Sequence, residues 1–396
     1  MNKKFKGISL FSGAGGMDIG FEKAGVEVIW ANELDKDASK TYQLNNPHTL
    51  LRQGDIRELY PELKQFKDVD IVFGGPPCQG FSVAGKMDPN DERSTLVWTF
   101  LDVVKLVKPK AFVIENVKAL GKLEKWQLVR EKIYKLASEM GYSCNTYILN
   151  SANYGVPQKR ERVFFVGFLN KNIEHEAFER RLIEQERHPK NIRETIAHLG
   201  PAGTEKNPLT CTAKITFATN PIMRKSPYAG NVFNGMGRPL NLDEASNTLP
   251  ASMGGNKTPI IDEEFLHGQA RENWVVNYHK GLYEGTIKPQ FASSPPTRLR
   301  RLTINEAALI QTFPEDYNFQ GSKTSIYKQI GNAVPCLLAE AVAKAVLEEL
   351  DNSQNITSGE SQLTFDDLVE RNNNSIIDSG EGFIDLKEGF IDLYKE

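Results

Sequence analysis

The hydrophobic pattern of the first 170 residues alternates between short apolar runs and stretches with helical spacing. Several runs are apolar at consecutive positions, which is typical of parallel strands covered on both faces. Stretches of helical spacing lie between them, as at 94–107 and 125–140. This alternation predicts the α/β class, with a doubly wound parallel sheet. The predicted strands are residues 7–11, 26–32, 70–75, 111–116 and 163–168.

The pattern changes after about residue 180. Helical periodicity fades beyond Glu194, and Gly, Pro, Asn and Thr become frequent. Such a composition suits irregular strands and long loops. We therefore expect residues 180–299 to form a second, smaller domain.

Regular helical spacing returns at 302–313 and 335–350. In the second stretch the apolar positions form one stripe, namely Leu338, Val342, Ala345 and Val346. A helix with a single apolar face has to bury that face against another element. We expect this helix to pack on the first sheet, so that residues 1–179 and 300–350 make up one domain.

The last 46 residues, 351–396, are polar and rich in Asn and Ser. They hold 11 acidic and three basic residues, a net charge of −8. The hexapeptide EGFIDL occurs twice, at 381–386 and at 388–393. The composition predicts an acidic, disordered tail. A tandem docking motif is the alternative interpretation of the repeat.

Charge and cysteine usage narrow the class of protein. The whole chain carries −3, so residues 1–350 carry +5, and residues 180–300 hold 16 basic and 11 acidic residues. This surplus is compatible with a polyanion partner without requiring one. No apolar run reaches the length of a membrane span, and the N-terminus is too short for a signal peptide. The four cysteines are far apart and form no CxxC pair, so we expect no metal site, no disulfides and a cytoplasmic location.

A glycine-rich turn, LFSGAGGMDIGFEKAG (10–25), follows the first predicted strand and opens a helix. Glycines let the backbone approach a ligand at a helix N-terminus, although a tight turn without a ligand is the alternative. Glu33 ends the second strand, where such folds place an acid that binds ribose hydroxyls. Asp55 is a second acid, or else a helix N-cap. With neither GxGxxG nor a Walker lysine, the set favours an adenosine ligand lacking pyrophosphate, and S-adenosylmethionine over NAD.

In the segment GGPPCQGFS (74–82), two prolines restrict the backbone directly before the thiol of Cys78, and a flexible, glycine-containing stretch follows it. Cys78 comes after a strand end, at the sheet edge where ligands bind. Two prolines fix the approach to it, and residues 79–93 have the composition of a loop able to close over a substrate. These features favour a nucleophile over a buried small hydrophobe.

Three charged residues complete the candidate chemistry. Glu115 ends the apolar strand FVIEN, where a carboxylate is costly unless it is paired or works in catalysis. Arg160 and Arg162 occupy alternate positions entering a strand, and therefore point to one face. A solvated strand end and a solvated basic face are the alternative interpretations.

Taken together, these segments resemble the DNA cytosine-5 methyltransferases, in an order that runs through most of the first 335 residues. PPCQGFS followed by ENV and QKRER is specific to that family, because adenine and N4-cytosine methylases carry Pro-Pro-Tyr or Pro-Pro-Trp here. The resemblance implies a Rossmann-like methyltransferase fold that binds S-adenosylmethionine. The matching segments are FSGAGG, NELD, GDI, GGPPCQGFS, ENV, QKRERVFFVG, RLTINEAALIQTFP and IGNAVP.

The resemblance also implies catalytic roles. Cys78 attacks C6 of a cytosine, which makes C5 nucleophilic enough to accept a methyl group. Glu115 shares a proton with N3 of the ring, Arg162 holds O2, and Arg160 orders the site. The base inside a duplex has to be flipped out before it can react.

Binding residues carry over in the same way. The expected cofactor residues are Phe11, Gly13, Gly15, Glu33, Asp55, Ile56, Pro77, Leu96, Asn332 and Ala333. The expected DNA contacts are Gln79, Ser82, Arg93, Thr248 and Leu249, the last two forming the Thr-Leu element of a target-recognition domain. The expected partners are duplex DNA and a cognate restriction endonuclease, with no membrane, and the chain is expected to act as a monomer.

Three other functions compete with this one. A tRNA cytosine-5 methyltransferase would use the same chemistry, although the long 180–299 segment favours DNA. A catalytically inactive nucleic-acid binder is disfavoured by the intact Cys78, Glu115 and Arg162. An NAD enzyme is disfavoured by the missing GxGxxG and by the Pro-Pro-Cys segment.

Overall fold

One seven-stranded sheet organises the computed structural model, which describes residues 4–77, 96–290 and 293–358. Neighbouring strands are parallel except around β8, which runs antiparallel to both β5 and β6. The predicted α/β class and Rossmann-like sheet are confirmed. In spatial order the strands are β3 (Leu50–Gln53), β2 (Val26–Glu33), β1 (Phe5–Leu10), β4 (Ile71–Gly74), β5 (Ala111–Val117), β8 (Glu161–Leu169) and β6 (Tyr142–Asn150).

The sequence analysis missed two of these strands and one direction. β3 is only four residues long and has no buried position, and β6 mixes polar and apolar residues. Neither therefore shows the continuous apolar run that marked the others. A short connection, residues 151–160, joins β6 to β8. Because parallel neighbours need a long crossover connection, so short a link makes these two strands antiparallel.

Alternate side chains of the central strands supply two separate hydrophobic cores, one on each face of the sheet. Val72 lies in one core, while Ile71 and Phe73 lie in the other. The first core includes side chains from α4 (Leu96–Val107) and α6 (Gln127–Glu139). The second includes side chains from α1 (Gly16–Ala24), α7 (His175–Glu184) and α13 (Cys336–Ser358).

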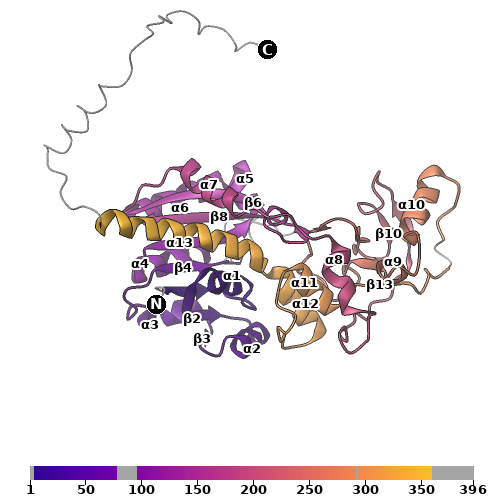
Figure 1. The fold of residues 1–396 in the computed structure, drawn as a ribbon, viewed down its shortest axis with the longest axis horizontal. Coiled ribbons are helices and arrows are strands. Elements are labelled where there is room, and N and C mark those ends of the chain that lie inside the picture. The colour runs from indigo at the N-terminus through magenta and orange to yellow at the C-terminus, as the bar shows by residue number, and fades with distance from the viewer. Residues whose placement is uncertain (1–3, 78–95, 291–292, 359–396) are drawn as a thin grey trace, which may run out of the picture. The chain divides into compact units, whose positions relative to one another are not determined.

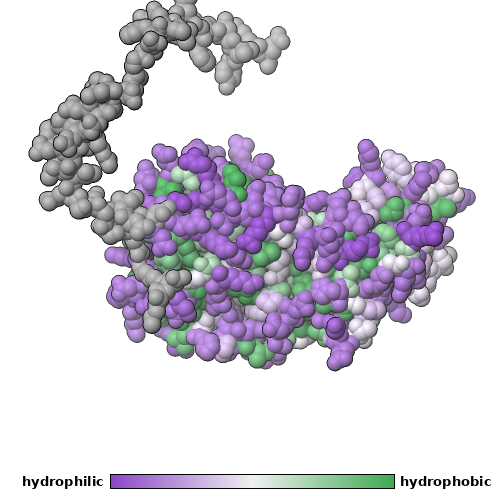
Figure 2. Space-filling model, in the orientation of Figure 1, coloured by the Kyte–Doolittle hydropathy of each residue, from purple (hydrophilic) through white to green (hydrophobic). Residues whose placement is uncertain are grey.

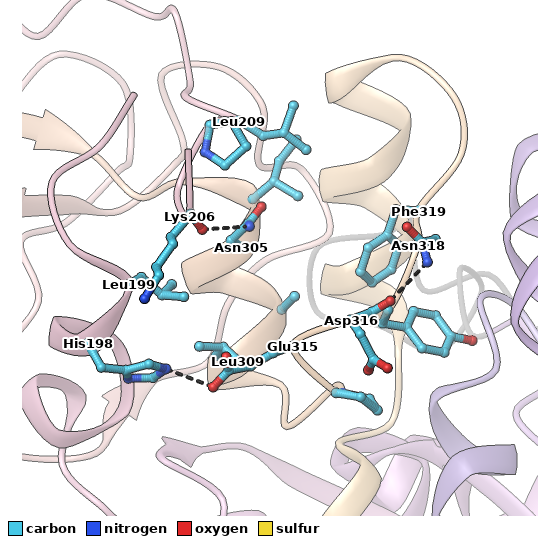
Figure 3. A pocket seen from close by; sticks show the side chains of 15 residues that line it. His198, Leu199, Lys206, Leu209, Asn305, Leu309, Glu315, Asp316, Asn318 and Phe319 are labelled. Carbon is cyan, nitrogen blue, oxygen red and sulfur yellow. Dashed lines mark hydrogen bonds and ion pairs between the residues drawn. The ribbon is translucent and has the colours of Figure 1, made fainter. Parts of the chain in front are cut away.

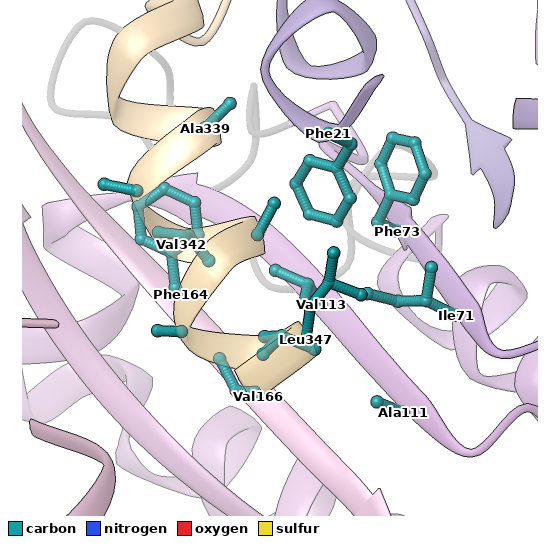
Figure 4. Close-up of a cluster of buried hydrophobic side chains, with 14 of the residues drawn as sticks. Phe21, Ile71, Phe73, Ala111, Val113, Phe164, Val166, Ala339, Val342 and Leu347 are labelled. Atoms are coloured by element: carbon teal, nitrogen blue, oxygen red, sulfur yellow. The ribbon is translucent and has the colours of Figure 1, made fainter. Parts of the chain in front are cut away.

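Helix α13 packs on the sheet as predicted. All four residues of its apolar stripe are buried in the second core. Figure 4 shows Val342 and Leu347 of this helix facing Phe164, Val166 and Val113 of the strands. The stretch Lys323–Asp351 is long and apolar enough to pass as a membrane span by composition, contrary to our expectation. It is 78% buried inside the protein, as a core helix is.

The segment between the sheet and α13 contains short strands and helices with cores of their own. One core gathers around Phe217, Phe233 and Tyr278. The elements of the segment are α8 (Ile192–Ile196), β9 (Phe217–Ile222), β10 (Asn231–Phe233), β11 (Ser246–Asn247), β12 (Ile260–Asp262), α9 (Glu263–Leu266), α10 (Trp274–Glu284), β13 (Leu299–Arg301), α11 (Ile304–Ile310) and α12 (Lys323–Asn332). Figure 1 shows α11 and α12 between the sheet and the part that holds β10, β13 and α10, and Figure 2 shows the surface hollowed between those parts.

Residues 1–350 form one unit and residues 351–396 a second. The separation of 180–299 from 1–179 and 300–350 as domains therefore stays a prediction. Of residues 351–396, the structure describes the end of α13 up to Ser358. The predicted disordered tail and its EGFIDL repeat lie outside the described residues.

A buried carboxyl lies in the first turn of α1. Asp18 is fully buried, and its Oδ1 accepts a hydrogen bond of 2.8 Å from the hydroxyl of Tyr42 in α2 (Lys36–Asn45). Burial raises the pKa of Asp18 from 3.8 to about 7, because the charged form is poorly solvated there, and the hydrogen bond opposes this rise. The protonated carboxyl is therefore the form that the fold favours.

This raised pKa predicts how the stability of the fold varies with pH. Below about pH 4 the carboxyl is protonated whether the chain is folded or unfolded. Between the unfolded pKa and about 7 only the folded state keeps the proton, so the free energy of unfolding falls as pH rises. Asp18→Asn keeps an oxygen for Tyr42 and removes this titration.

Urea unfolding of both proteins at about pH 4 and about pH 8 measures the effect. Relative to the variant, the wild type should lose on the order of 4 kcal/mol across this range. All other groups titrate in both proteins and cancel in the difference. Parallel pH profiles for the two proteins would contradict the assignment.

Candidate active site

The glycine-rich turn after β1 has backbone dihedral angles that residues other than glycine rarely adopt. Phe11, Gly13 and Gly15 have φ angles of 55°, 57° and 83°, which lie in the left-handed region that favours glycine. Apart from Gly13 and its two chain neighbours, no atom of the described residues lies within 4 Å of where a Cβ on Gly13 would be, so these residues leave the space beside it open. A Cβ on Gly15 would lie 2.8 Å from the hydroxyl oxygen of Tyr317. The turn is therefore open at Gly13 and closely packed at Gly15.

Glu33 lies at the end of β2 and is held against this turn. Its Oε2 accepts a 2.7 Å hydrogen bond from the Gly13 N–H, and its Oε1 accepts bonds from the N–H groups of Leu34 and Asp35. Burial raises the pKa of Glu33, and these three hydrogen bonds oppose the rise. Oε1 already accepts two hydrogen bonds, whereas Oε2 accepts one and has a second lone pair, so Oε2 can still accept from a ligand hydroxyl.

Segments from the far end of the chain support the same turn. The hydroxyl of Tyr317 donates to the carbonyl oxygen of Ala14 at 2.5 Å. A Cβ on Gly16 would lie 2.7 Å from the Val334 carbonyl oxygen and 3.0 Å from Ala333 Cβ. Residues 317 and 333–334 therefore lie against a turn that begins near residue 11.

The remaining predicted cofactor residues have varied surroundings. Asp55 caps a 3₁₀ helix, Ile56–Leu59, by accepting from the Arg57 N–H at 2.9 Å, which confirms the N-cap interpretation. The hydrogen bond from the Arg57 side chain lowers the pKa of Asp55. Ile56 is buried, Asn332 and Pro77 are exposed, and Leu96 is half-buried at the start of α4.

A buried ion pair lies where β5 ends and β8 begins. Arg162 Nε is 2.8 Å from Glu115 Oε1, and the two side chains are only 14% and 11% exposed. Burial raises the pKa of Glu115, while the positive charges of Arg162 and Arg160 oppose the rise. Neither a solvated strand end nor a solvated basic face describes this arrangement. It is a carboxyl with an elevated proton affinity beside two fixed cations.

The turn that leads to the thiol segment starts beside this pair. A Cβ on Gly75 would lie 2.9 Å from Glu115 Oε2, so a larger residue here would displace the carboxyl. The side-chain amide of Asn116 donates to the Pro76 carbonyl oxygen at 3.2 Å. Cys78 itself lies outside the described residues, as do Gln79, Ser82 and Arg93. What the structure shows is that the chain enters this segment next to Glu115.

Arg160 is a buried connector between distant segments. Only 2% of it is exposed, and its guanidinium donates to the carbonyl oxygens of Leu249 at 3.2 Å and of Gly331 at 2.9 Å. Leu249 is buried, so its side chain belongs to the core. Thr248 is exposed, and its hydroxyl donates to the Lys159 carbonyl oxygen at 3.0 Å. The Thr-Leu element therefore lies against β7 (Gln158–Lys159), the two residues that directly precede Arg160.

Three residues that the sequence analysis did not select also belong to this neighbourhood: Gln158, Gln311 and Tyr317. Gln158 shares the alternate spacing of Arg160 and Arg162, and this was a signal that could have identified it. Gln311 and Tyr317 gave no comparable signal, because their partners are backbone groups far away in the sequence.

A cavity in the described part of the chain lies away from these residues. Its volume is about 450 Å³, and it opens between α11, the residues around His198 and the loop 314–319 (Figure 3). None of the predicted site residues lines it, and ordinary pairs such as His198 with Glu315 occupy its wall. Within the described residues no group of His, Cys, Asp and Glu could hold a metal ion.

Comparison with known proteins agrees with this geometry. The family model for C-5 cytosine-specific DNA methylases matches residues 5–348. Type II methyltransferase M.FnuDI of Fusobacterium nucleatum is 35% identical over 91% of this chain and 99% of its own length. Type II methyltransferase M.NgoPII of Neisseria gonorrhoeae is 33% identical over 87% of this chain and 96% of its own length.

Solved structures show the same fold at lower identity. The Dnmt2 methyltransferase of S. pombe has a TM-score of 0.62 at 18% identity, over 88% of this chain and all of its own. At that identity the likeness establishes the fold alone. The family model and the relatives, by contrast, each span most of the chain. The chain therefore belongs to the C-5 cytosine-specific DNA methylases, and it is a DNA cytosine methyltransferase of the Type II restriction-modification kind.

Proposed function

We propose that this protein transfers a methyl group from S-adenosylmethionine to C5 of a cytosine flipped out of a specific duplex DNA sequence, through a covalent bond between Cys78 and C6. The observation that carries the proposal is the buried pair of Glu115 and Arg162 at the entrance to the Pro-Pro-Cys segment. It supplies a proton and a cation at one point, next to the chain that holds the nucleophile.

The residues around the glycine turn fit S-adenosylmethionine. The described residues leave open space beside Gly13 for a ligand, and Glu33 Oε2 has a lone pair free for a ribose hydroxyl. We assign Phe11, Gly13 and Gly15 to the methionine end, Asp55 and Ile56 to adenine, and Pro77, Leu96, Asn332 and Ala333 to the remaining walls. When bound, the cofactor supplies an electrophilic methyl group on its sulfonium sulfur.

The side chains around Glu115 suit the attack on cytosine. As the Cys78 thiolate adds to C6, negative charge spreads over the ring to N3 and O2. Glu115, whose pKa is raised by burial, donates its proton toward N3, while Arg162 stabilises O2. The C5 carbon thereby becomes nucleophilic. After methylation a water molecule takes the proton from C5, the electrons of that C–H bond re-form the C5=C6 double bond, and Cys78 leaves as a thiolate when its bond to C6 breaks. N3 then returns its proton to Glu115.

We assign DNA recognition to residues 180–299 and to the segment after Cys78. The excess of basic over acidic residues in 180–300 favours a polyanion. The hollow in Figure 2 lies between this part and the sheet. Gln79, Ser82 and Arg93 are proposed contacts, with residues 79–93 closing over the flipped base. Thr248 is exposed for a contact, and Leu249 anchors it through the core.

The same proposal covers the biological setting. The named relatives are Type II methyltransferases, and a restriction endonuclease with the same target is the partner we propose. We place the enzyme in the cytoplasm as a monomer, because one chain supplies every proposed catalytic group.

Labelled S-adenosylmethionine offers a direct test of polymer and nucleophile. The wild type should label duplex DNA and leave tRNA unlabelled. Cys78→Ser should lose DNA labelling by at least about 10³-fold, because a serine hydroxyl is almost never ionised at neutral pH. Its affinity for the cofactor should stay nearly unchanged in calorimetry. Label in tRNA alone, or an active serine variant, would overturn the proposal.

A DNA duplex with 5-fluorocytosine at the target position tests the covalent step separately. Fluorine cannot leave C5 as a proton does, so the bond to Cys78 should persist after methylation. Denaturing gels should then show a protein–DNA complex with the wild type and none with Cys78→Ser. An active wild type that forms no complex on its own target would contradict the adduct.

A further inference from the structure

We propose that Gln158 and Gln311 form a buried relay of side-chain amides that positions the DNA-recognition element and the cofactor segment relative to one another. The inference rests on the proposed function, since it concerns how the two ligand sites are joined. Neither side chain is exposed at all. Neither amide is assigned to a ligand, so both act as positioning residues.

The relay runs through four hydrogen bonds. The backbone N–H of Leu249 donates to Gln158 Oε1 at 2.8 Å. Gln158 Nε2 then donates to Gln311 Oε1 at 2.8 Å. Gln311 Nε2 in turn donates to the Ile330 carbonyl oxygen at 2.6 Å and to the Ala333 carbonyl oxygen at 3.3 Å. One end is therefore the Thr-Leu element, and the other is the segment that lies against the glycine turn.

The direction of these bonds is fixed by their ends. A backbone N–H can only donate and a backbone carbonyl can only accept. The amide of Gln158 must therefore turn its oxygen to Leu249, and the amide of Gln311 must turn its nitrogen to Ile330. Rotating either amide by 180° would place like groups opposite each other at two positions. Only one orientation of each amide therefore satisfies all of these hydrogen bonds, and this is what allows the two residues to fix the position of the segments.

The two segments that the relay joins are also in direct contact. A Cβ on Gly331 would lie 2.6 Å from Ala251 Cα and 2.6 Å from the Pro250 carbonyl oxygen. Arg160 bridges the same segments through the carbonyl oxygens of Leu249 and Gly331. The backbone N–H and C=O of Leu249 are thus both held by side chains of the strand entry that carries the catalytic arginines.

Through these hydrogen bonds, a shift of the Thr-Leu element would disturb the cofactor segment at 330–333, and the reverse. A displaced Leu249 would leave Gln158, and then Gln311, without a partner in a site that excludes water. Buried amides without partners are costly, so the cofactor segment follows the recognition element. We expect binding of DNA and binding of cofactor to be weakened together when the relay is cut at either residue.

Gln158→Glu and Gln311→Glu cut the relay with one-atom changes. An ionised carboxylate at position 158 would still accept from Leu249 but could not donate to Gln311, and one at position 311 could not donate to Ile330. Because burial favours the protonated carboxyl, which could still donate, both affinities are measured at about pH 8 and also in Gln158→Met and Gln311→Met, which cannot donate at any pH. Each variant should weaken cofactor affinity, measured by calorimetry without DNA, by roughly tenfold. Each should also weaken DNA affinity, measured without cofactor, by a similar factor. The double variant should lose no more than the larger single loss.

Gln329→Glu is the matched control. Gln329 is also a buried glutamine and is next to Ile330 in the chain, but its side chain binds Thr41, Gln320 and Ser325 and none of the relay groups. It should lower thermal stability and leave both affinities within about twofold. Gln158→Met and Gln311→Met, which have no charge, replace the glutamate variants if those fail to fold.

The outcomes separate the relay from the proposed function. A wild type that transfers no methyl group to DNA would overturn the function itself. With an active wild type, three results would overturn the relay: additive losses in the double variant, a Gln158 variant that affects DNA alone, or a Gln329 variant with the same losses. Non-additive losses at both ligand sites, confined to the relay variants, are the expected result.

Discussion

The ion pair between Arg162 and Glu115 is the interaction on which the rest of the site depends, and the direction of β8 makes it possible. β8 runs antiparallel to β5, so that Val117 pairs with Arg162 and Glu115 with Phe164. The first residues of β8 therefore meet the last residues of β5. In an all-parallel sheet the same arginine would enter at the opposite edge, away from the carboxyl ends where ligands bind. The antiparallel direction of β8 thus places Arg162 beside Glu115, the proposed proton donor.

Burial of this pair raises the proton affinity of Glu115, and it also makes the fold sensitive to the loss of either partner. Desolvation raises the pKa of Glu115, so the carboxyl holds a proton more firmly than one in water would. Losing either partner would leave a charge buried without compensation, which is strongly destabilising. The neighbouring residues accommodate the buried carboxyl and fix the chain beside it. Gly75 leaves room for the carboxyl, and Asn116 holds the Pro76 carbonyl, so the segment toward Cys78 begins at a fixed place.

Sequence patterns predicted the elements whose signal lies in the regular spacing of neighbouring residues. Apolar runs identified the central strands, and the stripe of α13 predicted its packing on the sheet. Glu115 stood out because a carboxylate follows four apolar residues. The direction of β8 was not predictable from its own residues, since it depends on the short link from β6. Gln311 and Tyr317 were missed for a related reason, because each binds a backbone group that no local pattern indicates.

Those missed residues share one physical task. The segments that converge on the site, around residues 14, 249 and 330–333, are loops or helix ends, so no neighbouring strand satisfies their backbone groups. Buried backbone groups must nevertheless be paired. Tyr317 satisfies the carbonyl of Ala14, while Arg160 and the two glutamines satisfy those of Leu249 and of 330–333. The bonds that remove this cost also fix how the segments lie, so the pairing of loop backbone by distant side chains is what makes one site from a discontinuous chain.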